Sequence, residues 1–174
     1  MPARTHILLV DLDEGTHLAD VGFGGMVLSA PLAFETGLEQ ITSHGAFHLE
    51  DAGGEPRSFV LQALVNSSWA NVYRFDLDSQ YDADYEMANH FVSTYPPSIF
   101  RHNLLGARLA HGVRYGLFNR RLHIHHTHDD GAASEQRDLE GVADLRRVLE
   151  DELGIRLPHG DEPAELDAAL SRLS

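Results

Sequence analysis

The order in which two hydrophobic periods occur along the chain limits its fold more than any other feature. Apolar residues recur at every second position through much of the first 80 residues, which is the period of half-buried strands. A helical period appears only later, over 82–92 and again over 138–153. A run of strands followed by helices is typical of antiparallel sheets that carry helices on one side. We therefore expect an α+β fold.

The first two strands should form a hairpin. Residues 5–12 contain the run Ile7-Leu8-Leu9-Val10, which is too short for a buried helix and apolar enough for a buried strand. A turn at 13–15 separates it from a returning strand at 16–21. The segment Gly22-Phe23-Gly24-Gly25 should end the pairing, because glycine permits positive φ angles.

Three more strands should form a meander. Alternation resumes at 47–49, continues over 59–63 after a turn at 52–56, and returns over 69–77. In the last of these strands the alternating residues are Trp69, Asn71, Tyr73, Phe75 and Leu77.

The second half of the chain mixes helices with short strands. A helix over 82–92 should be capped by Asp82 or Asp84 and end at Tyr95-Pro96-Pro97. Short strands should follow between residues 104 and 125, and the polar residues 126–136 read as an exposed loop.

The remaining residues predict two helices. The helix over 138–153 should stop at Gly154, and a last short helix should open at 161–163. The stripe expected to be buried on the longer helix is Leu139, Val142, Leu145, Leu149 and Leu153. We expect two domains, a β-barrel-like domain over 1–80 and a mixed α/β lid domain over 81–174.

Composition excludes several classes of function. A formal net charge of −14 leaves no basic surface for nucleic acid or an anionic membrane. The chain contains no cysteine, which removes disulfides, thiolate metal sites and thiol nucleophiles. No apolar segment follows Met1 or approaches the length of a membrane span, so we expect a cytoplasmic protein. All 13 basic residues are arginine, a codon-related bias that points to a bacterial source.

His6 and Asp20 lie near the two ends of the predicted hairpin. A histidine that acts as a general base needs a carboxylate on its far nitrogen, which fixes the tautomer and stabilises the imidazolium. Neighbouring positions on paired strands can bring two such side chains together. The alternative is a hairpin that carries one unrelated polar residue at each end.

Motifs in nearly the whole chain resemble, in order, those of the arylamine N-acetyltransferase family. The most specific is DVGFGG, which follows the spaced Thr5-His6 pair. The segments that carry the resemblance are THILLV (5–10), LADVGFGG (18–25), PL (31–32), WANVYRF (69–75), DYEMAN (84–89), STYPPSIF (93–100) and LEDELGIRL (149–157).

The resemblance implies a ping-pong acetyl transfer by a cysteine–histidine–aspartate triad. A thiolate would take acetyl from acetyl-CoA, and an arylamine or arylhydrazine would then accept it. His6 and Asp20 match the family's catalytic histidine and aspartate. Phe23 and Gly24 would line the acyl and substrate pocket. The residues that would contact the coenzyme are Thr5, Phe91 and Pro97.

The sequence departs from the family at the nucleophile, since the family's cysteine lies in an N-terminal helical domain upstream of the histidine. The chain resembles only the last two domains of this cysteine-protease-like acetyltransferase fold, so we expect it to be inactive alone. Three explanations remain open: a truncated or mis-started gene product, a nucleophile domain on a separate chain, or a homologue that lost the chemistry. The missing domain predicts an uncovered apolar face that self-associates or docks a partner.

Two other readings remain as alternatives. The chain could be a non-catalytic module that binds a CoA-like ligand or a protein. A serine could replace the cysteine, although none of the candidates Ser29, Ser43 and Ser98 lies in a nucleophile-elbow motif.

Residues 120–130 contain four histidines and two aspartates, so a metal site has to be weighed. His123 and His125 share a strand face and could chelate zinc or nickel, with His126 and His128 on the other face. The plainer interpretation is a strand that runs into a solvated loop at Asp129-Asp130. We expect no metal cofactor.

Overall fold

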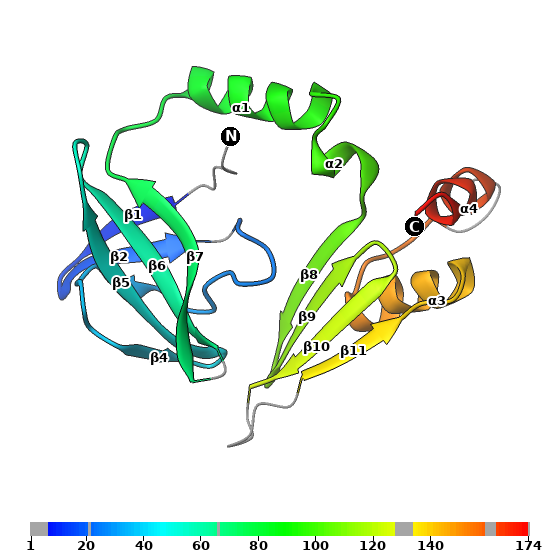
Figure 1. Ribbon diagram of the computed structural model, residues 1–174, viewed down its shortest axis with the longest axis horizontal. Coiled ribbons are helices and arrows are strands. Elements are labelled where there is room, and N and C mark those ends of the chain that lie inside the picture. Colours follow the sequence, from blue (N-terminus) through cyan, green and yellow to red (C-terminus); the bar gives the residue numbers. More distant parts are fainter. Residues whose placement is uncertain (1–6, 21, 66, 128–133, 159–162, 174) are drawn as a thin grey trace. The chain divides into compact units, whose positions relative to one another are not determined.

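The structure is a computed structural model that describes residues 7–20, 22–65, 67–127, 134–158 and 163–173. The chain packs as two compact units, residues 1–85 and 86–174, and each is described by itself. The expected mixture of antiparallel sheets and helices is confirmed (Figure 1). The domain boundary expected after residue 80 stays a prediction, because compact packing does not show that either unit folds alone.

The first unit contains two antiparallel sheets. The three-stranded sheet has the order β1-β2-β3 and the four-stranded sheet has the order β4-β5-β6-β7. Their strands are β1 (Ile7–Leu12), β2 (Gly15–Asp20), β3 (Leu32–Ala33), β4 (Gln40–Thr42), β5 (Gly45–Gly53), β6 (Ser58–Val65) and β7 (Ser68–Asp76). The predicted hairpin and meander are therefore confirmed, and β4 is an additional edge strand. Leu18 from β2 packs with Phe47, Leu49 and Leu61 in one core between the two sheets.

The expectation that the first strand is buried was wrong. β1 pairs with β2 in the register Ile7 to Asp20, but its apolar side chains Leu8, Leu9, Val10 and Leu12 are 39% to 52% exposed. Within the described residues β1 has a strand neighbour on one side only. A run of apolar residues predicts a strand, but it does not show what covers that strand.

An irregularity in β7 reverses its alternation. Leu61 pairs with Tyr73 and Gln62 pairs with Asn71, so β7 has one extra residue, Val72, at this point. Tyr73 consequently points into the core. Trp69 lies on the other face of the sheet, where its ring stacks on the ring of His48 with centroids 4.0 Å apart. The predicted common face for residues 69–77 is therefore wrong.

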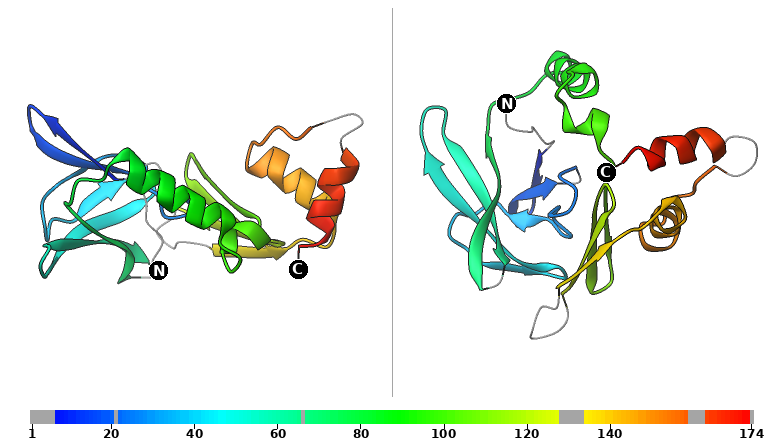
Figure 2. Two further views of the ribbon diagram at one scale, coloured as in Figure 1. Left: turned by 90° about the horizontal axis from the view of Figure 1, so that it is seen from above. Right: turned by 45° about the vertical axis from the view of Figure 1, so that its right-hand side comes forward.

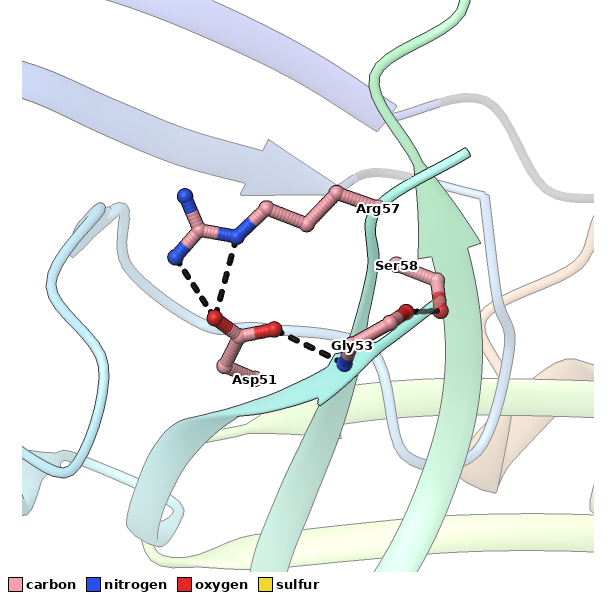
Figure 3. A network of polar contacts seen from close by, with 4 residues as sticks. All are labelled: Asp51, Gly53, Arg57 and Ser58. Carbon is pink, nitrogen blue, oxygen red and sulfur yellow. Dashed lines mark hydrogen bonds and ion pairs between the residues drawn. The ribbon is translucent and has the colours of Figure 1, made fainter. Parts of the chain in front are cut away.

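A polar network fixes the turn between β5 and β6 (Figure 3). Asp51 accepts hydrogen bonds from Arg57 at 2.6 Å and 3.0 Å, and from the backbone N–H of Gly53 at 2.8 Å. The hydroxyl of Ser58 donates to the Gly53 carbonyl at 2.9 Å. The Arg57 guanidinium lowers the pKa of Asp51, and the Gly53 N–H lowers it further. Both backbone groups of Gly53 are thus hydrogen-bonded, the N–H to Asp51 and the carbonyl to Ser58.

The second unit contains a four-stranded sheet of order β11-β10-β9-β8 and several helices. Its strands are β8 (Leu105–Ala110), β9 (Val113–Phe118), β10 (Arg121–His126) and β11 (Ser134–Asp138). Its helices are α2 (Ile99–His102), α3 (Val142–Arg147), the π-helical turn η1 (Val148–Glu152) and α4 (Pro163–Ser171). Figure 2 shows α3 (orange) and α4 (red) next to one another, and the two helices are in contact. α1 (Asp82–Thr94) crosses the boundary between the units and confirms the helix predicted over 82–92.

The expected start of the long helix at residue 138 and the expected loop over 126–136 need correction. Residues 134–138 form β11, which pairs with β10 at the edge of the sheet, and α3 begins at Val142. The side chains of β11 are polar and almost all exposed, so no hydrophobic period marks this strand. The apolar stripe is confirmed for Leu145, Leu149 and Leu153, which are buried in the core of this unit. Leu139 is buried in the same core but precedes α3, and Val142 is only partly buried.

Arginines bind the carboxyl ends of three helical segments. Arg101 donates to the carbonyl of Thr94 at the end of α1, at 3.0 Å. Arg108 donates to the carbonyl of Glu152 at 3.1 Å, and Arg120 reaches the carbonyl of Ser171 at 3.5 Å. Carbonyls at a helix end lack partners within the helix, and a cation there also meets the negative end of the dipole. The last turns of α1, η1 and α4 contain no basic residue of their own, so these arginines supply the cation at each helix end.

We predict that Gly154→Ala destabilises the protein. Gly154 ends η1 with φ +70°, and a Cβ there would lie 3.0 Å from the Arg108 guanidinium. A left-handed backbone costs a non-glycine residue roughly 1–2 kcal/mol, so the urea midpoint should fall accordingly. Gly116→Ala in β9 is the control, because a Cβ there has nothing within 4 Å and its φ is ordinary. Equal losses for both variants would contradict this account of Gly154.

Candidate functional site

Asp20 is the best-placed member of the predicted pair. It ends β2, it is 3% exposed, and it lies opposite Ile7 in the strand register. Its Oδ1 accepts the backbone N–H of Gly22 at 2.9 Å. The turn immediately after the strand thus supplies a donor to the carboxylate. His6 precedes Ile7 in sequence, but His6 and Thr5 lie outside the described residues.

Tyr73 is a residue of this site that the sequence reasoning missed. Burial raises the pKa of the Tyr73 phenol above its usual range, and the charge and hydrogen-bonding capacity of the Asp20 carboxylate raise it further. The phenol therefore stays protonated, and its buried hydroxyl has no hydrogen-bond partner among the described residues. The available signal was the tyrosine in WANVYRF, since a buried tyrosine hydroxyl normally has a polar partner.

Phe23 and Gly24 lie in the loop that follows β2. The ring of Phe23 packs at 4.8 Å from the ring of Tyr73 and is partly buried against the core. Gly24 adopts φ +86°, and its carbonyl accepts the N–H of Val27 at 3.0 Å. A positive φ explains glycine at this position, because a Cβ there would have nothing within 4 Å. Asp20, Phe23 and Gly24 are thus brought together in the first unit.

Phe91 and Pro97 belong to the second unit. Phe91 lies on α1, is 40% exposed, and stacks on Tyr95 with ring centroids 4.5 Å apart. Pro97 follows the end of α1, in a segment held by the hydroxyl of Ser98, which donates to the carbonyl of Val92 at 2.5 Å. Phe91 and Pro97 thus belong to a different unit from Asp20, and Thr5 lies outside the described residues.

The serines considered as replacements for the cysteine nucleophile make local polar contacts. The hydroxyl of Ser43 lies 3.3 Å from that of Ser29 and 3.0 Å from Nδ1 of the adjacent His44. Ser98 is engaged at the end of α1, as described above. Neither arrangement includes a strained turn of the kind that presents a catalytic serine.

The histidine-rich strand does not gather a ligand set in the part of the chain that the structure describes. There, no group of three histidine, aspartate or glutamate side chains could hold a metal ion. Nδ1 of His125 lies 2.8 Å from the hydroxyl of Ser134, and burial followed by the charge of Arg114 lowers the His125 pKa. His128, Asp129 and Asp130 lie outside the described residues. Among the described helices, none is long and apolar enough to cross a membrane.

Known proteins resemble the chain over almost its whole length. Residues 1–161 match the model of a protein family described as N-acetyltransferase. The arylamine N-acetyltransferase of Escherichia coli K12 is 42% identical over 158 residues, which are 89% of this chain and 54% of that protein. The arylamine N-acetyltransferase / N-hydroxyarylamine O-acetyltransferase of Salmonella typhimurium LT2 is 36% identical over 176 residues, which cover 98% of this chain and 60% of that protein. The chain thus spans 54% to 60% of the length of these relatives.

Solved structures agree with the sequence matches. The arylamine N-acetyltransferase of Mycobacterium marinum in complex with CoA superimposes with a TM-score of 0.88 at 35% identity, over 99% of this chain and 62% of that one. The enzyme from M. tuberculosis gives 0.85 at 32% identity, over 95% and 60%. The sequence matches, the antiparallel sheets and the DVGFGG motif that begins at Asp20 lead to one conclusion: the chain belongs to the arylamine N-acetyltransferase family.

Proposed function

We propose that this chain supplies the histidine–aspartate part of an arylamine N-acetyltransferase active site. The observation that carries the proposal is the environment of Asp20. A buried carboxylate at a strand end, with the Gly22 N–H as a donor and Tyr73 beside it, suits a group that orients an imidazole. Its strand partner Ile7 directly follows His6 in sequence, which supports the pairing of His6 with Asp20.

In the proposed reaction His6 takes the proton of a cysteine thiol while Asp20 holds the imidazole. The thiolate attacks the carbonyl of acetyl-CoA, and CoA leaves as a thiol. An arylamine or arylhydrazine nitrogen then attacks the acetyl thioester and regenerates the cysteine. Because the chain has no cysteine, the nucleophile must come from another polypeptide segment, and we expect the 174-residue chain alone to be inactive.

The substrate contacts also belong to this proposal. Phe23 and Gly24 would border the acyl group next to the His6–Asp20 pair, and Thr5, Phe91 and Pro97 would contact acetyl-CoA. The CoA complex of the M. marinum relative supports acetyl-CoA as the acyl donor. We further propose that the first unit corresponds to a β-barrel-like domain and the second to an α/β lid domain. The exposed apolar side chains of β1 support an additional covering surface, either a docked helical domain or a second copy.

The function can be tested in a chimera that joins this chain to the part of the E. coli relative with which it does not align. We expect acetylation of an arylamine by the chimera and none by the chain alone. Asp20→Asn should lower kcat/KM at least about 100-fold, because an amide does not hold the imidazole in the reactive tautomer. Asp11→Asn is the matched control on the same hairpin, where Asp11 accepts a 2.7 Å hydrogen bond from Thr16 at an exposed position.

An active chimera that tolerates Asp20→Asn would remove Asp20 from the mechanism. An inactive chimera that folds and binds CoA would favour the alternative of a non-catalytic binding module.

We expect Tyr73→Phe to weaken the same chimera without unfolding it. The variant keeps the aromatic ring beside Phe23 and removes only the hydroxyl, whose pKa the Asp20 charge helps to raise. Loss of a polar group near a buried charge is worth roughly 1–3 kcal/mol, so kcat/KM should fall roughly tenfold or more. Tyr115→Phe in β9 provides the control. Unchanged kinetics in Tyr73→Phe would show that the phenol does not serve Asp20.

Coenzyme binding can be measured on the chain itself by titration calorimetry. We expect CoA to bind and Phe91→Ala to raise the Kd about tenfold, since stacking of one base on an aromatic ring is worth roughly 1–3 kcal/mol. Tyr81→Ala removes an aromatic side chain that is 72% exposed just before α1, and it should leave the Kd unchanged. Equal Kd values for all three proteins would remove Phe91 from the coenzyme site.

A further inference from the structure

Two consecutive prolines limit how the turn after α1 can be held. Pro96 and Pro97 have no backbone N–H, so this part of the turn can be hydrogen-bonded only through its carbonyl oxygens. The turn begins at Tyr95, whose exposed ring stacks on that of Phe91, and it contains Pro97, a predicted coenzyme contact. The groups that bind these carbonyls therefore determine the shape of the predicted coenzyme surface.

His102 binds the carbonyl between the two prolines. Its Nε2 lies 2.6 Å from the carbonyl oxygen of Pro96. A carbonyl oxygen can only accept a hydrogen bond, so Nε2 carries a proton and donates it. This holds for the neutral imidazole with its proton on Nε2 and for the imidazolium alike. The hydrogen bond ties the middle of the turn to the last residue of α2.

The two preceding carbonyls also have donors. Arg101 donates to the carbonyl of Thr94 at 3.0 Å, and the backbone N–H of Ser98 donates to the carbonyl of Tyr95 at 2.9 Å. Three consecutive carbonyls thus accept hydrogen bonds from Ser98 and the α2 helix that follows it. Residues 98–104 are called here the α2 brace.

The α2 brace is anchored to the sheet of the second unit. Figure 1 shows α2 between the end of α1 and the start of β8. The buried Asn119, in the turn after β9, accepts the N–H of Leu104 at 2.9 Å and donates its own backbone N–H to the Leu104 carbonyl at 2.8 Å. Its side-chain amide donates to Oδ1 of Asn103 at 2.9 Å. The imidazole of His102 therefore extends from a backbone that the sheet holds in place.

We propose that His102 is a positioning residue for the coenzyme: its imidazole holds the carbonyl of Pro96, and this fixes the position of Pro97. The proposal rests on the proposed function, since it assumes that Phe91 and Pro97 contact acetyl-CoA. A turn that is already in its bound conformation loses less conformational freedom on binding than a turn that the ligand must order. His102 therefore raises the affinity for the coenzyme without touching it.

The test is calorimetric titration of the 174-residue chain with CoA. His102→Leu removes the donor and should raise the Kd about fivefold, because one hydrogen bond no longer holds the turn. His102→Gln should keep the Kd within about twofold of the parent value, since a glutamine N–H can take the place of Nε2–H. His123→Leu removes an exposed histidine of β10, and as the matched control it should leave the Kd unchanged.

Amide hydrogen exchange measures the turn itself, in the absence of ligand. The Ser98 N–H, which donates to the Tyr95 carbonyl, should exchange about fivefold faster in His102→Leu and at the parent rate in His102→Gln. Gly154→Ala separates this local effect from a general loss of stability. We expect that variant to destabilise the same unit and to bind CoA with the parent Kd.

Faster exchange at Ser98 with an unchanged Kd in His102→Leu would overturn the role of His102 alone, and Phe91→Ala would then show whether the coenzyme site stands. Equal increases in Kd for His102→Leu and Gly154→Ala would also overturn it, since stability alone would then explain both. A parent chain that does not bind CoA would overturn the coenzyme contacts and the role of His102 together. If His102→Leu does not fold, His102→Phe replaces it, because phenylalanine keeps a ring and lacks the N–H.

Discussion

A carboxylate that is removed from water must find donors, and this requirement at Asp20 governs the surrounding structure. The chain meets it with local means, because the N–H of Gly22 lies two residues further on and reaches Oδ1 at 2.9 Å. That contact requires β2 to end at Asp20 and a tight turn to follow at once. It also draws the loop with Phe23 and Gly24 toward Tyr73. One buried charge therefore links the end of a strand, the shape of a loop and a tyrosine from the other sheet.

Much of the fold could be predicted because its elements carry a hydrophobic period or a breaking residue. The hairpin, the meander, α1 and the buried stripe around Leu145 and Leu149 follow from such patterns. β11 could not be predicted this way, since Ser134 to Asp138 contain no apolar residue. The reversal in β7 was also invisible, because a bulge depends on how two strands pair and leaves no mark in the alternation of one of them.

The candidate site likewise contains residues that could be predicted from the sequence and residues that could not. Asp20 could be found because it stands in a specific short motif, and the structure adds its burial and its donor. Tyr73 stands 53 positions further along the chain, and only the packing of the two sheets brings it to Asp20. Pairings between distant segments depend on tertiary contacts, which a single sequence does not display. The roles of Thr5, His6, Phe91 and Pro97 remain predictions from the family resemblance.

Two of the edge strands, β1 and β11, differ in a way that bears on the handling of the protein. β11 presents serine, glutamate, glutamine, arginine and aspartate, and charged or polar side chains at an edge discourage the addition of another strand. β1 presents leucine and valine at its exposed positions, with Asp11 as its single charge. An exposed apolar edge of this kind is a template for aggregation. We therefore expect β1 to promote self-association of the isolated chain, and a charged substitution there to improve its yield in concentrated solution.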